Sequence, residues 1–240
     1  MQLAGIFDSD PKRSPFAGAH MVFMPYCSSD AWIGNTGNHS TPLNFFFRGQ
    51  VILEAAIKQF QEGITVDTVL TLPTWLPNHT HATQTTTGFF QLTANDRVLF
   101  GGCSAGARGA LFTLDYVQAM LPPGSPQVLG FLDSPLWVDM VPIDPKITTP
   151  LEAQTQLIFG VVNATARLGT ECARVYPGDE GWRCLYAQYR LPYITTPYLM
   201  SASQFDKFAL PWNEGGAERE RERRDANAYR VFERRRARRV

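Results

Sequence analysis

A serine placed between two glycines is the feature of this sequence that most directly indicates catalysis. Ser104 lies in the pattern Gly102-x-Ser104-x-Gly106, between a predicted strand and a predicted helix. This context is typical of a nucleophile elbow, a tight turn that raises the serine hydroxyl above the carboxyl edge of a sheet. The N–H of Ala105, at the start of the helix, would then point at the oxyanion that forms when an ester is attacked. The alternative is a glycine-rich turn without catalytic function.

A serine nucleophile needs a base and an acid, and in this kind of fold they follow it in the order Asp or Glu, then His. Asp206 follows a late apolar segment, residues 193–201, at the kind of strand end where a triad acid belongs. The histidines are His20, His39, His79 and His81. All of them precede Ser104, so the sequence offers an acid but no histidine in the expected place.

Apolar runs and helical periodicity alternate around these residues. We predict strands at residues 20–26, 64–72, 97–100, 127–132 and 193–201. We predict helices at residues 49–61, directly after the elbow, and at 151–162. Residues 73–93 lack a clear period and are predicted to be a loop or an insertion. Strands that alternate with helices indicate an α/β fold with a mostly parallel sheet flanked by helices.

Several blocks in one order resemble the pectin acetylesterase family, which also includes the Notum-type carboxylesterases that remove palmitoleate from Wnt proteins. They are Phe-Asp-Ser-Asp-Pro at 7–11, the block around Tyr-Cys-Ser-Ser-Asp at 25–34, Phe-Arg-Gly-Gln at 47–50, Gly-Cys-Ser-Ala-Gly at 102–106, Leu-Asp-Ser at 132–134 and Gln-Phe-Asp at 204–206. The paired Cys172 and Cys184, with a tryptophan between them, also match. The likeness spans about residues 5–212.

The resemblance implies an α/β-hydrolase-like fold and a role for individual residues. It makes Ser104 the nucleophile, Asp206 the triad acid and Ala105 an oxyanion donor. Asp30 and Trp32 are expected near the acyl or sugar pocket. It also favours a disulfide between Cys172 and Cys184, whose spacing alone leaves two unrelated thiols open.

Two departures from the family pattern concern the ends of the chain. The Gly-rich segment with a Trp that completes the oxyanion hole should precede Met1, and the triad histidine should follow Asp206. We therefore expect an α/β-hydrolase-like fold that is incomplete at both ends. Its domain is predicted at 1–214, with a possible insertion at 73–93 and a low-complexity Arg/Glu tail at 215–240.

Two classes of function remain open at this point. The first is a serine carboxylic ester hydrolase that removes acetyl groups from a pectin-like polysaccharide, or acyl groups from a protein, through an acyl-enzyme on Ser104. The second is a catalytically inactive fragment or pseudoenzyme of the same family that lacks the triad histidine. We expect no cofactor and no metal, because no ligand spacing such as Cys-x-x-Cys occurs.

Several features indicate an extracellular protein. Sequons for N-glycosylation begin at Asn38, Asn78 and Asn163. No signal peptide is visible, and no apolar run is long enough to predict a membrane span. We expect secretion on the basis of the sequons and the cysteine pair. Whether Cys27 and Cys103 have disulfide partners stays open.

The charge distribution argues against a nucleic-acid-binding function. Residues 217–240 carry ten Arg against four Glu and one Asp, whereas the rest carries 12 basic and 17 acidic side chains. The body of the protein is therefore mildly acidic. The basic tail is expected to be a solvated helix or a disordered end, and a tail that binds RNA or a membrane is the alternative.

Overall fold

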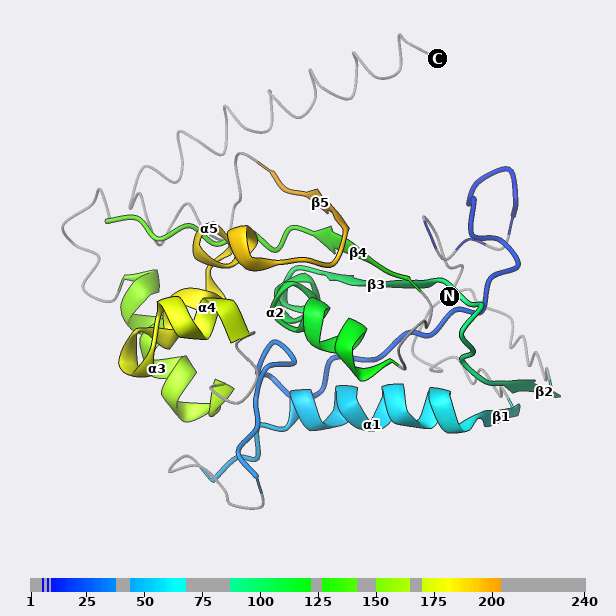
Figure 1. Cartoon of the computed structure of the whole chain (residues 1–240), viewed down its shortest axis with the longest axis horizontal. Coiled ribbons are helices and arrows are strands. Elements are labelled where there is room, and N and C mark those ends of the chain that lie inside the picture. The colour runs from blue at the N-terminus through cyan, green and yellow to red at the C-terminus, as the bar shows by residue number, and fades with distance from the viewer. Residues whose placement is uncertain are drawn as a thin grey trace, which may run out of the picture. The chain divides into compact units, whose positions relative to one another are not determined.

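The computed structural model describes residues 6, 8, 10–37, 44–67, 87–121, 127–141, 150–164 and 170–203 (Figure 1). The chain divides into two compact units. One comprises residues 1–27 and 58–92, and the other comprises residues 28–57 and 93–240. Each unit is described by itself below.

The larger unit contains a three-stranded parallel sheet. Its strands are β3 (Val98–Cys103), β4 (Val128–Asp133) and β5 (Tyr198–Ser201), in the spatial order β3-β4-β5. Their carboxyl ends are in register, because Cys103 pairs with Asp133 and Asp133 pairs with Ser201. This arrangement confirms the predicted parallel sheet, and it brings whatever follows each strand to one edge.

Helix α2 (Ala105–Met120) packs on one face of this sheet. On β4 the buried positions Val128, Gly130 and Leu132 alternate with partly exposed ones. Gly130 is needed there, since a Cβ at this position would come within 2.8 Å of the Leu114 side chain of α2. In a parallel sheet whose strands follow one another in order, right-handed connections place their helices on one face. Helix α2 belongs to such a connection, because it joins β3 to the neighbouring strand β4.

The connection from β4 to β5 folds into a module of short helices. They are α3 (Leu151–Val161), α4 (Thr170–Val175), η3 (Gly178–Leu185), α5 (Ala187–Arg190) and η4 (Leu191–Tyr193). Their buried side chains form a core with Phe112 of α2, centred on Trp182 and Tyr186. A disulfide joins Cys172 to Cys184 in this core, which confirms the pairing favoured by the resemblance.

Helix α1 (Gly49–Glu62) confirms the helix predicted at 49–61. Its residues Gly49, Gln50, Leu53 and Ile57 are buried, at the spacing of one helical face. In the smaller unit β1 (Ile64–Asp67) pairs antiparallel with β2 (Thr87–Phe90).

Two predicted strands and one predicted loop need correction. Residues 20–26 form no strand, and Phe23 is 70% exposed, because a short apolar run without a paired neighbour does not make a buried strand. Residues 87–90, predicted as part of a loop, form β2, although most of residues 73–93 lies outside the described residues. The segment 193–197 precedes β5 instead of belonging to it, since Pro192 and Pro197 favour a turn there.

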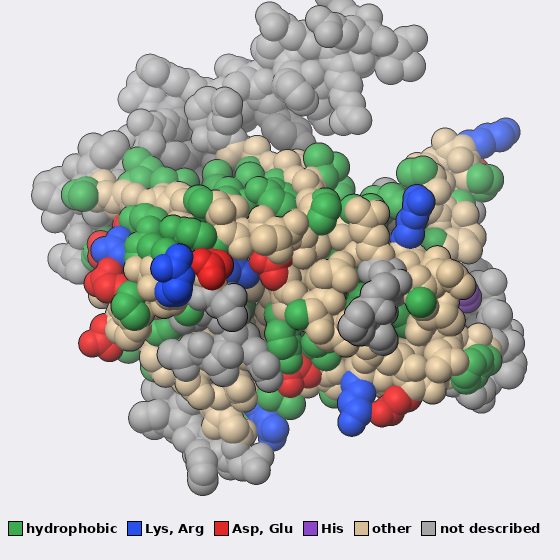
Figure 2. All heavy atoms as spheres, in the orientation of Figure 1, with side chains coloured by type: hydrophobic (Ala, Val, Ile, Leu, Met, Phe, Trp, Pro, Cys, Tyr) green, Lys and Arg blue, Asp and Glu red, His purple; other side chains and the backbone are tan. Residues whose placement is uncertain are grey.

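The surface of the described residues is mixed in charge. Figure 2 shows acidic and basic side chains next to one another on the face in view. Ion pairs among the described residues include Arg174–Glu171 and Arg183–Glu180. Among the helices that the structure describes, none is both long and apolar enough to cross a bilayer.

Candidate active site

Ser104 lies at the sharp turn between β3 and α2. Its backbone has φ 53° and ψ −119°, a conformation that residues other than glycine rarely adopt. The Ser104 N–H donates a 2.9 Å hydrogen bond to the carbonyl oxygen of Asp133, at the end of the neighbouring strand. The side chain is exposed at the carboxyl edge of the sheet. This is the geometry that the elbow motif predicts.

The N–H groups at the start of α2 are the local source of positive potential. Ala105 is the first residue of this 16-residue helix, so its N–H has no acceptor within the helix. The helix dipole adds about half a positive charge at this end. The Ser104 N–H already donates to the Asp133 carbonyl oxygen. The Ala105 N–H is therefore the better candidate for the oxyanion donor.

The two glycines of the motif differ in what they do. A Cβ at Gly102 would come within 2.5 Å of the Gly106 carbonyl carbon, so the close approach of strand and helix excludes any side chain there. A Cβ at Gly106 would meet no described atom within 4 Å. Steric need therefore explains Gly102, while nothing in the described residues explains Gly106.

Asp133 and Cys103 lie side by side in the register of β3 and β4. Partial burial, together with the hydrogen bond and negative charge of Asp133, raises the pKa of the Cys103 thiol. This shift favours the protonated form of the thiol that directly precedes Ser104.

The side chains of Arg108 and Trp137 contact each other at the same edge of the sheet. The sequence did not predict this contact. The Arg108 N–H closes the first turn of α2 on the Ser104 carbonyl oxygen at 3.0 Å. Its guanidinium carbon lies 2.9 Å from the centre of the Trp137 ring, which follows β4. A cation in the first turn of a helix opposes the helix dipole, and this mismatch could have drawn attention to Arg108.

The segment after β4 is also tied to the helical module. Asp139 accepts a 2.6 Å hydrogen bond from the Tyr189 hydroxyl and forms an ion pair of 3.5 Å with Arg183. The Asp139 N–H donates to the Gln188 side chain at 2.9 Å. These contacts fix the course of the chain that carries Trp137.

Asp30 holds a strained loop. Ser29, Ala31 and Trp32 all have positive φ angles, between 52° and 62°. The Asp30 carboxylate accepts hydrogen bonds from the N–H groups of Trp32 at 2.9 Å and Gly34 at 3.2 Å. The Ser28 hydroxyl donates to it as well. Asp30 is 3% exposed, and these donors satisfy part of its buried carboxylate.

This loop packs directly on the nucleophile helix. A Cβ at Gly109 of α2 would come within 2.2 Å of the Ala31 carbonyl oxygen and 2.9 Å of the Trp32 Cβ. Trp32 itself is 9% exposed. The loop of Asp30 and Trp32 thus lies against the second turn of α2, and contact of either residue with a substrate stays a prediction.

Several predicted site residues lie outside the described residues. They are Asp206, Asn38, Asn78, His39, His79 and His81. His20 is described, and in its own unit its ring lies 4.8 Å from the ring of Phe90. Asn163 is exposed after α3, and its side-chain N–H donates to the Asn35 carbonyl oxygen at 2.7 Å. In the described part of the chain no cluster of three metal-ligating side chains occurs.

Animal carboxylesterases match most of this chain in sequence. The chain is 26% identical over 217 residues to the human palmitoleoyl-protein carboxylesterase NOTUM, covering 86% of this chain and 37% of that protein. It is 27% identical over 222 residues to the Drosophila melanogaster protein of the same name, covering 90% and 29%. The chain therefore spans about a third of the length of these relatives.

The fold has solved counterparts too. A crystal structure of the Wnt deacylase Notum from Drosophila matches with a TM-score of 0.67 and 23% identity, over 89% of this chain and 55% of that one. This match supports the α/β-hydrolase-like fold. The sequence pattern of the pectinacetylesterase family matches residues 88–224, more than half of the chain and a region that includes Ser104. This chain belongs to the pectinacetylesterase family.

Proposed function

We propose that the protein is a carboxylic ester hydrolase that uses Ser104 as its nucleophile. The observation that carries this proposal is the strained turn at Ser104, which raises the side chain between β3 and the N-terminus of α2. Strain of this kind is kept in a fold when the surrounding structure gains a function from it. Membership of the pectinacetylesterase family supports the same class of reaction.

In the proposed reaction Ser104 attacks the ester carbonyl carbon while a base removes its proton. The negative charge that develops on the carbonyl oxygen is stabilised by the Ala105 N–H and the dipole of α2. The alcohol leaves with a proton, and water then hydrolyses the acyl-enzyme to release the carboxylic acid. Asp206 would orient the base, as the resemblance implies. None of the four histidines follows Ser104 in this sequence, so a histidine base from this chain has to come from its N-terminal half.

Two acyl substrates are supported by different observations. The family name supports acetyl groups on a pectin-like polysaccharide. The names of the human and Drosophila relatives support a fatty acyl group on a protein. Acetyl and long-chain p-nitrophenyl esters distinguish them, because a pocket for a long chain gains about 0.8 kcal/mol for each CH₂ that it buries.

The direct test compares the purified protein with Ser104→Ala in hydrolysis of p-nitrophenyl acetate. We expect turnover that Ser104→Ala abolishes, and labelling of Ser104 by a fluorophosphonate. Circular dichroism must show both proteins folded. A folded protein with no turnover that depends on Ser104 would exclude the esterase function for this chain.

That negative result would favour the second candidate, a non-catalytic member of the family. The position of all four histidines before Ser104 is the observation that supports it. Binding of acetylated pectin or of an acylated peptide to the Ser104→Ala protein, measured by calorimetry, would then be the relevant activity.

Secretion and N-glycosylation are proposed as well. The disulfide Cys172–Cys184 supports an oxidising compartment, since such bonds persist outside the cytosol. Asn163, at the start of a sequon, is exposed, and its side-chain nitrogen donates to the Asn35 carbonyl oxygen. Expression in a secreting eukaryotic cell, followed by glycosidase treatment, would reveal the glycan as a loss of mass that Asn163→Gln reduces.

A further inference from the structure

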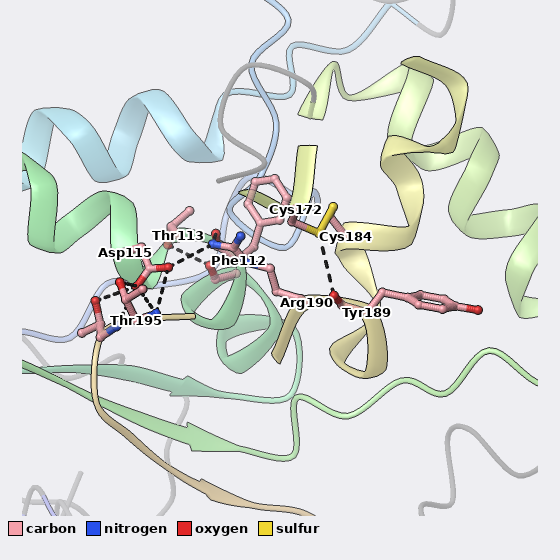
Figure 3. A network of polar contacts seen from close by, with 10 residues as sticks. Phe112, Thr113, Asp115, Cys172, Cys184, Tyr189, Arg190 and Thr195 are labelled. Carbon is pink, nitrogen blue, oxygen red and sulfur yellow. Dashed lines mark hydrogen bonds and ion pairs between the residues drawn. A yellow bond between two sulfur atoms is a disulfide. The ribbon is translucent and has the colours of Figure 1, made fainter. Parts of the chain in front are cut away.

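Asp115 of α2 gathers hydrogen bonds from the turn that leads into β5 (Figure 3). One oxygen of its carboxylate, Oδ1, accepts from four donors. The Thr195 N–H and hydroxyl lie 3.1 and 3.2 Å away. The Thr196 N–H and hydroxyl both lie 2.8 Å away. Two successive residues thus direct their main-chain and side-chain donors at a single acceptor.

A buried cation completes this arrangement. Arg190, at the end of α5, is 1% exposed, and its Nη2 lies 3.7 Å from Oδ2 of Asp115. The same nitrogen donates to the Phe112 carbonyl oxygen of α2 at 3.4 Å. Burial lowers the pKa of Arg190, and the negative charge of Asp115 opposes that effect. Figure 3 shows Arg190 reaching from its helix toward α2, between Asp115 and the disulfide.

Asp115 links two parts of the chain that matter for the candidate site. One is the helix that begins after Ser104, and the other is the strand that leads in sequence to Asp206. Asp115 is part of the helix whose N-terminus carries Ser104. Thr195 and Thr196 immediately precede β5, whose residues pair with β4 from Gly130 to Asp133. Asp206 comes five residues after the last residue of β5. Any shift of β5 along β4 would therefore move the chain that leads to Asp206 relative to Ser104.

We propose that Asp115 is a positioning residue that locks the start of β5 to the nucleophile helix, and so fixes the register of the strand that leads in sequence to Asp206. Ordinary sheet hydrogen bonds alone leave a four-residue strand free to slip, because parallel pairing repeats every two residues. Four donors on one carboxylate fix a single register. This role rests on the proposed esterase function, which it refines.

The test uses the full chain with two variants that remove different parts of the network. Asp115→Asn removes the negative charge that attracts the four donors and Arg190, and its amide keeps one acceptor oxygen. The double variant Thr195→Val, Thr196→Val removes only the two hydroxyl donors and leaves the pair of Asp115 and Arg190, so it keeps the test open if Asp115→Asn does not fold. Thr155→Val is the matched control, because its buried hydroxyl donates to the Leu151 carbonyl oxygen at 2.8 Å, within the helical module.

Two readouts separate positioning from general stability. The first is kcat and KM for p-nitrophenyl acetate, measured well below the unfolding temperature and expressed per folded molecule. We expect Asp115→Asn to lower kcat at least about 10-fold with little change in KM, since misplacing a catalytic group by about 1 Å costs up to 100-fold. The second is amide hydrogen exchange of residues 194–203, which should become faster in both variants.

The control should lower the unfolding temperature without changing kcat or exchange in β5. Unchanged kcat in Asp115→Asn, or unchanged exchange in residues 194–203, would overturn the positioning role alone. Absence of Ser104-dependent turnover in every protein, including the unmodified one, would overturn the proposed esterase function and this role with it. The two failures are therefore distinguishable.

Discussion

The carboxylate of Asp30 accepts a 2.7 Å hydrogen bond from the N–H of Gly49, the first residue of α1. This bond joins the strained loop before it to the N-terminus of a 14-residue helix. A carboxylate at a helix N-terminus satisfies a free N–H and interacts favourably with the helix dipole. One buried side chain thus holds together two segments that are 19 residues apart.

Asp30→Asn should destabilise the protein strongly. The amide keeps one acceptor oxygen but presents N–H₂ to backbone N–H groups, so donors of the loop lose their partner. We expect a loss of about 3 kcal/mol in the free energy of unfolding, measured by urea denaturation. Asp179→Asn, at an exposed position in η3, is the control and should change it by less than about 0.5 kcal/mol. Equal losses in the two variants would contradict a structural role for Asp30.

Gly109→Ala should disrupt the packing of the same loop on α2. Its Cβ would lie 2.2 Å from the Ala31 carbonyl oxygen, and backbone on both sides leaves little room to adjust. We expect a loss of about 2 kcal/mol or more in urea denaturation. Gly160→Ala in α3 is the control, since its Cβ would meet no described atom within 4 Å and alanine favours a helix. A neutral Gly109→Ala would mean that the loop does not pack on α2 as described.

Ser104→Gly should make the protein more stable while removing its nucleophile. Glycine adopts a φ of 53° without steric cost, whereas serine there stores strain of about 1–3 kcal/mol. We expect a net gain of about 1 kcal/mol, read as a higher thermal midpoint in calorimetry. Ser201→Gly, in the extended backbone of β5, should instead lower the midpoint. A lower midpoint for Ser104→Gly would argue against strain at the elbow.

The sequence was most informative where one local pattern determines the structure. The helical spacing of apolar residues predicted α1 almost to its ends, and the glycine pattern located the elbow at Ser104. The residues used for the prediction of α1 were Val51, Ile52, Ala55, Ala56 and Phe60. The side chains that the helix buries are instead those of Gln50, Leu53 and Ile57. Both predictions depend on interactions between near neighbours in the chain. The disulfide, in contrast, followed from the family resemblance, because spacing alone left the pairing of Cys172 open.

Contacts between distant segments could not be predicted in the same way. Nothing in the residues around Asp115 indicates that Thr195 and Thr196 lie beside it, about 80 positions later in the chain. The stacking of Arg108 on Trp137 depends likewise on the register of β3 and β4. Asp30 was assigned to a pocket by resemblance, and only its hydrogen bonds reveal how it holds the loop.

Alkaline pH should destabilise the protein through Tyr186. Burial raises the pKa of Tyr186 to about 12, from an ordinary value of about 10. Since the unfolded chain loses this proton first, the contribution is complete below pH 10 and is lost as the pH rises toward 12. Urea midpoints measured from pH 8 to 12 should fall over that range, and fall less steeply in Tyr186→Phe. The exposed Tyr198→Phe serves as the control and should follow the unmodified protein.

The bond from the Ser104 N–H to the Asp133 carbonyl oxygen runs entirely through the main chain. Any amino acid at position 133 can supply a carbonyl oxygen, so the placement of the elbow tolerates sequence drift on the neighbouring strand. A library randomised at position 133 should retain many folded members, whereas one randomised at Gly102 should retain almost none. The nucleophile is therefore held by a part of the protein that can vary in evolution without moving it.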